Sequence, residues 1–181
     1  MRLIAAVMLA FGLALSAGKV QASDPENMLY IDLESGRVVV ELYPDVAPRH
    51  VERIKSLARE GFYDGIVFHR VIDGFMAQTG DPTGTGMGGS DHPDLPAEFS
   101  DRSFERGSLG MARSNDPDSA NSQFFIMFAD AEHLDGQYTL FGQVIEGMEH
   151  VDAIKRGDPA NNGTVEDPDR MIRVQVAADA E

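Results

Sequence analysis

The chain has 181 residues, enough for one domain with a sizeable core, and its 43% hydrophobic and 25% charged residues are typical of a globular protein. It contains no cysteine, which excludes disulfides, thiolate zinc sites, a cysteine nucleophile and a lipid-anchored N-terminal cysteine. Thirty acidic residues against 15 basic ones give a formal net charge of −15, and such a surface repels nucleic acid and anionic membranes.

The first 22 residues predict a secretory signal peptide. Arg2 precedes an apolar run over residues 3–15, and Val20-Gln21-Ala22 is a small-residue cleavage site before Ser23. The run is shorter than the ~20 residues that a membrane span needs, and the alternative is an uncleaved anchor. We therefore expect one domain over residues 23–181, with a net charge of −17 and no stable membrane insertion. The expected location is the periplasm in a cell with two membranes, and the medium otherwise.

A β-hairpin and a helix are predicted at the start of the mature chain. Residues 29–33 and 37–42 are β-rich runs joined by Glu34-Ser35-Gly36, which favours a hairpin. The helix is predicted over residues 47–60, because Pro48 suits a first turn and Gly61 an end. An apolar stripe should face its interior side: Val51, Ile54, Leu57 and Ala58.

Short β-type segments then recur between Gly, Pro and Asp clusters. They lie at residues 66–69, 75–78, 108–112, 124–127, 141–144 and 171–176. A second, shorter helix is predicted over residues 148–155, before Gly157. Many short strands with only two helices favour an antiparallel barrel or sandwich over a parallel sheet. Closure into a barrel would also remove exposed sheet edges.

Two motifs suggest ligand sites and are interpreted as loops. Residues 84–89 contain G-x-G-x-x-G, but Pro93 and Pro96 follow where a dinucleotide site needs a helix. Residues 158–169 match part of a calcium-loop template, but Ala160 occupies a ligand position and Asp169 replaces the bidentate Glu. The five histidines form no compact ligand pair. The sequence therefore predicts no metal and no cofactor.

Two other segments mix polar and large apolar residues. Residues 68–81 read Phe-His-Arg-Val-Ile-Asp-Gly-Phe-Met-Ala-Gln-Thr-Gly-Asp, and residues 122–126 read Ser-Gln-Phe-Phe-Ile. Alternate residues of a strand face opposite sides, so these runs supply both a core face and a second face. Arg70 needs a surface or a partner, because burying an unpaired cation is very costly.

These segments resemble the cyclophilins. The resemblance extends to residues 84–89, Leu-Gly-Met-Ala at 109–112, Leu-Asp-Gly at 134–136 and Phe-Gly-Gln-Val at 141–144, and it runs from about residue 28 to 176. It implies a mainly β fold, a closed eight-stranded antiparallel β-barrel capped by two α-helices. It also implies peptidyl-prolyl cis-trans isomerase activity on proline-containing polypeptide clients, and we expect a monomer.

The resemblance also implies roles for individual residues. Arg70 corresponds to the catalytic arginine. The proline ring would be enclosed by Phe75, Met76, Phe125 and Leu134. The peptide groove would be lined by Gln78, Ala112 and Gln123, with backbone groups near Ala112 and Arg113 pairing with the peptide. The chain departs from the best-known eukaryotic pattern at His133, Tyr138 and Arg113, where Trp, His and Asn are usual. The first two departures predict weak cyclosporin binding more than they affect catalysis.

Arg70 separates the leading hypothesis from its alternative. Rotation about an X–Pro bond breaks no bond, so it requires neither a nucleophile nor a metal. A guanidinium N–H can meet the lone pair that the prolyl nitrogen gains when the amide twists. The alternative is a non-catalytic chaperone module that binds proline-containing segments, and such a module does not need this arginine. The polar groove residues disfavour an exported barrel that binds a small ligand.

Overall fold

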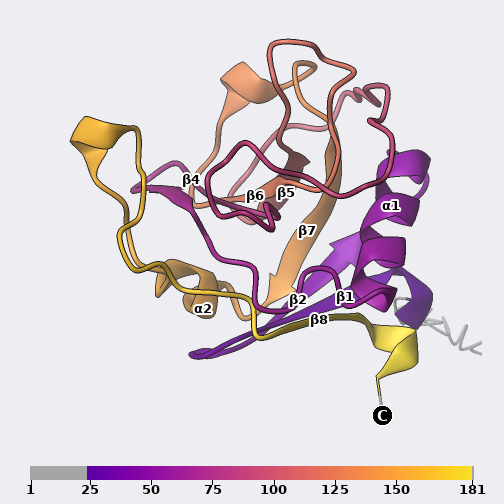
Figure 1. Ribbon diagram of the computed structural model, residues 1–181. Helices are drawn as coiled ribbons and strands as arrows, with labels where there is room; N and C mark the ends of the chain where they lie inside the picture. Colours follow the sequence, from indigo (N-terminus) through magenta and orange to yellow (C-terminus); the bar gives the residue numbers. More distant parts are fainter. Residues whose placement is uncertain (1–23, 181) are drawn as a thin grey trace, which may run out of the picture.

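Eight strands form one antiparallel sheet in the computed structural model, which describes residues 24–180 (Figure 1). The strand order is β3-β4-β6-β5-β7-β2-β1-β8. The strands are β1 (Met28–Leu33), β2 (Gly36–Leu42), β3 (Arg70–Ile72), β4 (Met76–Thr79), β5 (Ser108–Met111), β6 (Phe124–Met127), β7 (Leu140–Glu146) and β8 (Arg173–Val176). The predicted mainly β class and the hairpin of β1 and β2 are confirmed. The predicted signal peptide lies outside the described residues.

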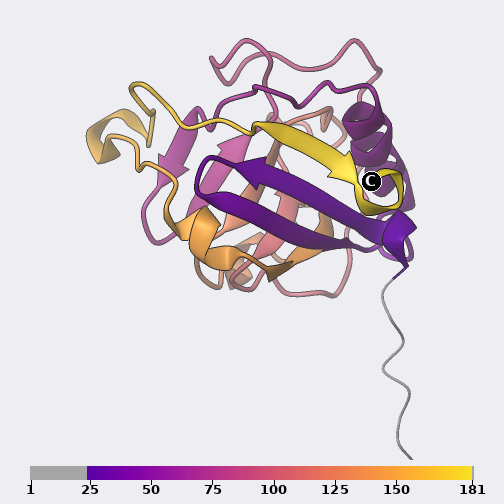
Figure 2. The ribbon, with the colours of Figure 1, turned by 90° about the horizontal axis from the view of Figure 1, so that it is seen from below.

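The prediction of a closed barrel is corrected by the structure, in which the sheet curls into a half-barrel. Its edge strands β3 and β8 are not paired with each other, and β8 lies beside β1 (Figure 2). Irregular chain spans the gap instead. The N–H of Phe68 donates to the carbonyl of Asp169 at 2.8 Å, and that of Met171 donates to the carbonyl of Ile66 at 2.9 Å. The strand predicted over residues 66–69 is therefore wrong, since these groups bond to a loop and the strand begins at Arg70.

Residues 24–180 contain two α-helices: α1 (Pro48–Arg59), which packs against β8, and α2 (Met148–Asp152), which packs against β2 (Figure 1). The predicted apolar stripe of α1 is buried. The second helix ends three residues earlier than predicted, because the N–H of Lys155 donates to Oδ2 of Asp169 at 2.7 Å instead of to a helix carbonyl. Within residues 24–180, no helix is long and apolar enough to cross a membrane.

Strand alternation divides the buried side chains into two clusters. On β6, Phe124 and Ile126 belong to the main core, whereas Phe125 and Met127 belong to a second cluster. On β4, Ala77 faces the main core and Met76 joins the second cluster. Since successive side chains point to opposite faces, one pair of strands builds both the core and a separate apolar surface. The candidate site lies on this second cluster.

Candidate active site

One cross-strand row places the central side chains of the site. Arg70 on β3 is opposite Gln78 on β4, Gln78 is opposite Phe125 on β6, and Phe125 is opposite Gly110 on β5. Directly opposed residues share a face of the sheet, so the guanidinium, the amide and the ring lie side by side. A Cβ on Gly110 would lie 2.4 Å from Cζ of Phe125, so the missing side chain at 110 leaves the space that this ring occupies.

A pocket of about 190 Å³ lies over this row. Nine of the predicted site residues line it: Arg70, Phe75, Met76, Gln78, Ala112, Arg113, Phe125, Leu134 and Tyr138. Gln123 lines an adjoining cavity instead, which shares Gln78, Ala112 and Arg113 with the first. His133 lines neither; it is exposed and stacks on Phe75, with ring centroids 5.6 Å apart.

The apolar part of the pocket is closely packed. Phe125 is 6% exposed, and its ring stacks on that of Phe104 at 5.8 Å and meets the edge of Tyr138 at 5.8 Å. Met76 and Leu134 are buried beside it, the latter on the 3₁₀ turn Glu132–Leu134. Such packing holds side chains in single rotamers, so the pocket offers a preformed apolar surface of the kind that suits an aliphatic ring.

A chain of hydrogen bonds orients the polar side of the pocket. Nη1 of Arg70 donates to Oε1 of Gln78 at 3.1 Å, and Nε2 of Gln78 donates to Oε1 of Gln123 at 2.9 Å. Nε2 of Gln123 donates in turn to the carbonyls of Gly86 and Gly88, at 3.1 and 2.8 Å. Each amide is fixed by a donor on one side and an acceptor on the other, so the guanidinium is held in one orientation.

Asn162 is the second anchor of Arg70, and the sequence did not reveal it. Its backbone carbonyl accepts from Nε and its Oδ1 accepts from Nη2, both at 3.0 Å. Asn162 has φ +52°, a left-handed conformation in which Asn is enriched. The Asn162-Gly163 pair predicts a turn, but the sequence does not indicate that this turn contacts Arg70, 92 positions away. These contacts leave two of the five guanidinium N–H donors of Arg70 free for a ligand.

The pocket is electropositive in an acidic protein. Among residues 24–180, no carboxylate lines the pocket, whereas Arg70 and Arg113 both line it. Burial lowers the pKa of Arg70, and the hydroxyl of Tyr138 opposes that shift. Arginine nevertheless stays protonated in proteins, so both cations are permanent.

One backbone donor of the predicted peptide groove is occupied. The N–H of Ala112 donates to the carbonyl of Gln123 at 2.9 Å. It continues the pairing of β5 with β6 beyond Met111. Within residues 24–180, the carbonyls of Ala112 and Arg113 and the N–H of Arg113 therefore remain for a peptide.

The glycine-rich segment is a loop, as the prolines after it predicted. The carboxylate of Asp81 accepts from the N–H and hydroxyl of Thr83, at 2.7 and 2.8 Å, and from the N–H of Gly86 at 2.6 Å. Burial would raise the pKa of Asp81, but the bonds from Thr83, Gly88 and Gly86 outweigh it and lower the pKa to about 2. The loop that accepts from Gln123 is therefore held by a permanent anion.

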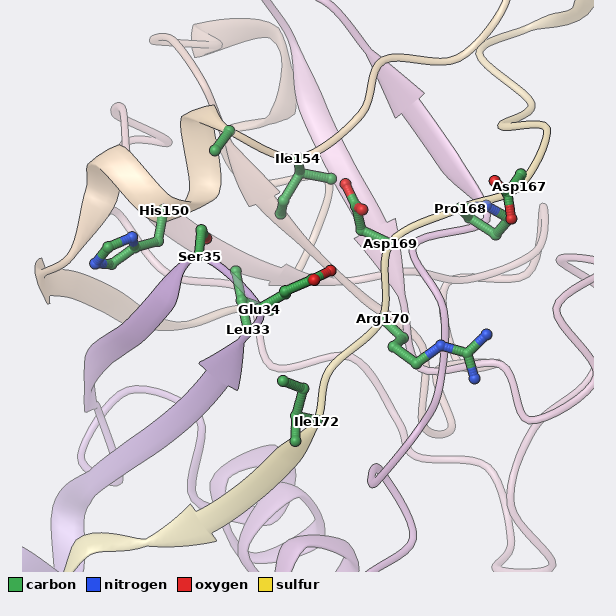
Figure 3. Close-up of a pocket in the computed structure, with 11 residues that line it drawn as sticks. Leu33, Glu34, Ser35, His150, Ile154, Asp167, Pro168, Asp169, Arg170 and Ile172 are labelled. Carbon is green, nitrogen blue, oxygen red and sulfur yellow. The ribbon is translucent and has the colours of Figure 1, made fainter.

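A larger cavity, of about 720 Å³, lies elsewhere, between the turn of β1 and β2, the region of α2 and the approach to β8 (Figure 3). Its charged residues are Glu34, Asp167, Asp169 and Arg170, and Ile154 and Ile172 contribute apolar surface. None of the predicted site residues lines it. Cavity size therefore does not identify the active site in this fold.

Known proteins share this fold. An eight-stranded antiparallel half-barrel with two helices is the architecture of the cyclophilins. A cyclophilin from Hirschia baltica superposes with a TM-score of 0.77 at 27% identity, covering 87% of this chain and 76% of that one. A cyclophilin-type isomerase from Cryptosporidium parvum, solved in the presence of the dipeptide Ala-Pro, has a TM-score of 0.76 at 29% identity, covering 82% and 98%.

Sequence comparison identifies the family. The model described as cyclophilin type peptidyl-prolyl cis-trans isomerase/CLD matches residues 28–176. A probable peptidyl-prolyl cis-trans isomerase from Brucella suis is 54% identical over 180 residues, 92% of each chain. Peptidyl-prolyl cis-trans isomerase B from Bacillus subtilis is 42% identical over 139 residues, 76% of this chain and 96% of that one. The chain belongs to the cyclophilin-type peptidyl-prolyl cis-trans isomerases, and the resemblance drawn from its motifs is confirmed.

Acid should destabilise the fold through His69, which precedes Arg70 in the chain. His69 is 7% exposed, and within residues 24–180 neither ring nitrogen makes a hydrogen bond of good geometry. Burial lowers the pKa of His69; Asp81 and a contact with the backbone of Val67 oppose the shift, and Arg70 adds to it. A histidine with a lowered folded-state pKa binds its proton more readily when unfolded. Stability is therefore complete above about pH 6.5 and is lost as the pH falls toward the lower, folded-state value.

Urea unfolding at pH 7.5 and 5.0 measures this loss. We expect His69→Gln to reduce the pH dependence relative to that of the wild type. Equal pH dependence in wild type and His69→Gln would show that His69 does not contribute.

Proposed function

We propose that this protein accelerates X–Pro rotation in exported client polypeptides as a monomer, with Arg70 hydrogen bonding to the prolyl nitrogen of the twisted amide. The observation that carries the proposal is the position of Arg70, held by Gln78 and Asn162 with two N–H donors free beside the pocket of Phe125. The Cryptosporidium relative crystallised with Ala-Pro supports a proline-containing ligand.

The mechanism requires an interaction that is stronger in the transition state than in the ground state. Amide resonance sets a rotation barrier of ~18–20 kcal/mol, and twisting returns a lone pair to the prolyl nitrogen. A guanidinium N–H meets that lone pair, whereas the planar amide offers it little, so the barrier falls. The apolar pocket holds the ring and excludes water, which strengthens the contact. An acceleration of about 10³–10⁵ needs only about 4–7 kcal/mol.

Exchange NMR on an Ala-Ala-Pro-Phe peptide tests the proposal directly, because it measures cis-trans rates without a coupling protease. Catalytic amounts of protein, residues 23–181, should raise the exchange rate well above that of the peptide alone. Peptide that binds, as seen by chemical-shift changes, but exchanges at the uncatalysed rate would instead support the non-catalytic chaperone module.

Export is tested by N-terminal sequencing of the protein from its native host. We expect a mature chain beginning at Ser23, recovered from the periplasmic fraction of a cell with two membranes. Replacing Ala22 by a bulky residue, Ala22→Trp, should block cleavage and leave the precursor at the membrane. Recovery of the chain beginning at Met1 from the cytosol would contradict export.

Cyclosporin inhibition should be weak and should depend on position 133. His133 is exposed beside Phe75, where a tryptophan would add a broad apolar face and an indole N–H. We expect His133→Trp to strengthen inhibition about tenfold or more, a gain of roughly 1.4 kcal/mol, and to change peptide turnover less. The control His133→Phe supplies area without the N–H. Tight inhibition of the wild type, with no gain from tryptophan, would contradict the role of this position.

A further inference from the structure

The electrostatics of the pocket indicate which X–Pro sequences it prefers. We infer that Arg113 selects client segments that carry an Asp or Glu at one of the two positions before the proline. This inference rests on the proposed function, since it concerns the same pocket, and it names a specificity-determining residue.

Arg113 is fixed in place by neutral groups. Its Nε and Nη2 donate to the carbonyl of Gln137, at 3.3 and 2.8 Å, and its Nη1 donates to the carbonyl of Ser114 at 2.9 Å. The guanidinium also lies over the ring of Tyr138, 4.4 Å from the centroid. Tyr138 in turn packs edge-on against Phe125, so the guanidinium of Arg113 is connected through Tyr138 to the apolar part of the pocket.

These contacts leave the charge of Arg113 uncompensated. Within residues 24–180, no carboxylate lies at ion-pair distance from it, although Arg37, Arg59, Arg106 and Arg156 all have such partners. Three N–H donors are used, so one remains on each of Nη1 and Nη2. A pair of N–H groups on one planar cation matches a carboxylate, which can accept both.

The position of Arg113 places this charge where a peptide must pass. It lines both the proline pocket and the adjoining cavity, together with Gln78 and Ala112. The adjoining cavity holds a single carboxylate among its lining residues, and that group, on Asp94, accepts from Nδ2 of Asn121 at 2.9 Å. A peptide that places its proline in the first pocket and continues into the adjoining cavity therefore passes beside Arg113. The overall charge of −15 does not cancel this preference, because exposed charges beyond about 8 Å are screened at physiological salt.

Exchange NMR with paired peptides tests the inference. The set is Ala-X-Pro-Phe and X-Ala-Pro-Phe, with X as Glu, Gln or Lys, where Gln is the uncharged match for Glu. In the wild type at 150 mM salt, where charges remote from the pocket are screened, we expect kcat/KM for Glu to exceed that for Gln about fivefold at one of the two positions, with Lys the lowest. The ratio of Glu to Gln should shrink toward one at 500 mM salt.

Arg113→Gln should bring the Glu-to-Gln ratio to about one, and Arg113→Lys should keep part of it. Arg102→Gln removes a cation outside both cavities, where Arg102 lies over Tyr43, and should keep the full ratio. Equal rates for Glu and Gln in the wild type, or an undiminished ratio in Arg113→Gln, would overturn the inference. Absence of turnover for all six peptides would instead overturn the proposed function.

Discussion

Arg70→Ala is expected to lower kcat/KM for X–Pro isomerisation about 100-fold and to leave the fold intact. Removing one preorganised donor from a charge-stabilising site typically costs 10²–10³ in rate. Arg70 is half-buried and bonds to two neighbouring groups, Gln78 and Asn162, without contributing to the main core. Its loss should therefore change the free energy of unfolding by about 1 kcal/mol. Exchange NMR and urea unfolding measure the two effects separately.

Two further variants show whether the geometry of Arg70 matters as well as its charge. Arg70→Lys keeps the charge but loses the planar set of donors, and should recover only part of the rate. Asn162→Gly keeps the left-handed backbone and its carbonyl, and removes only the Oδ1 acceptor. We expect it to lower kcat about threefold to tenfold with little change in KM. Wild-type turnover by Arg70→Ala would refute the proposed mechanism.

Local pattern predicted most elements of this fold because their causes are local. The hairpin of β1 and β2 follows from β-branched runs around Glu34-Ser35-Gly36, and α1 follows from Pro48, Gly61 and an apolar stripe. The strand β6 was placed at its observed bounds, since four large apolar residues follow a polar turn.

The errors lie where distant groups compete for backbone bonds. Residues 66–69 have the composition of a strand, but their partners are the loop residues Asp169 and Met171. The same contacts replace the last pairing that would close the barrel. The contact of Asn162 with Arg70 was not predicted for a similar reason, since it depends on a turn that brings together two residues 92 positions apart in the sequence. Motif resemblance supplied the pocket residues because it carries long-range information that periodicity lacks.

Phe125→Ala is expected to weaken both peptide binding and stability. The ring is 6% exposed, stacks on Phe104 and fills the space above Gly110, so truncation leaves a cavity that rigid neighbours cannot close. Removing a buried phenylalanine costs about 3–5 kcal/mol. The same change removes the floor of the proline pocket, so KM should rise about tenfold or more, as a loss of apolar contact with the ring predicts. Urea unfolding and peptide titration followed by NMR measure these effects.

The adjacent residue provides the matched control. Phe124 occupies the same strand, is 1% exposed and packs edge-on against Tyr63 and Phe141, but it faces the main core. Phe124→Leu and Phe125→Leu should each lose about 1–2 kcal/mol of stability, because each removes part of a buried ring. Only Phe125→Leu should weaken peptide binding, since of the two side chains only that of Phe125 lines the pocket. Equal loss of binding in the two variants would show that the effect spreads through the sheet, and Phe125 would then be a structural residue and not a binding residue.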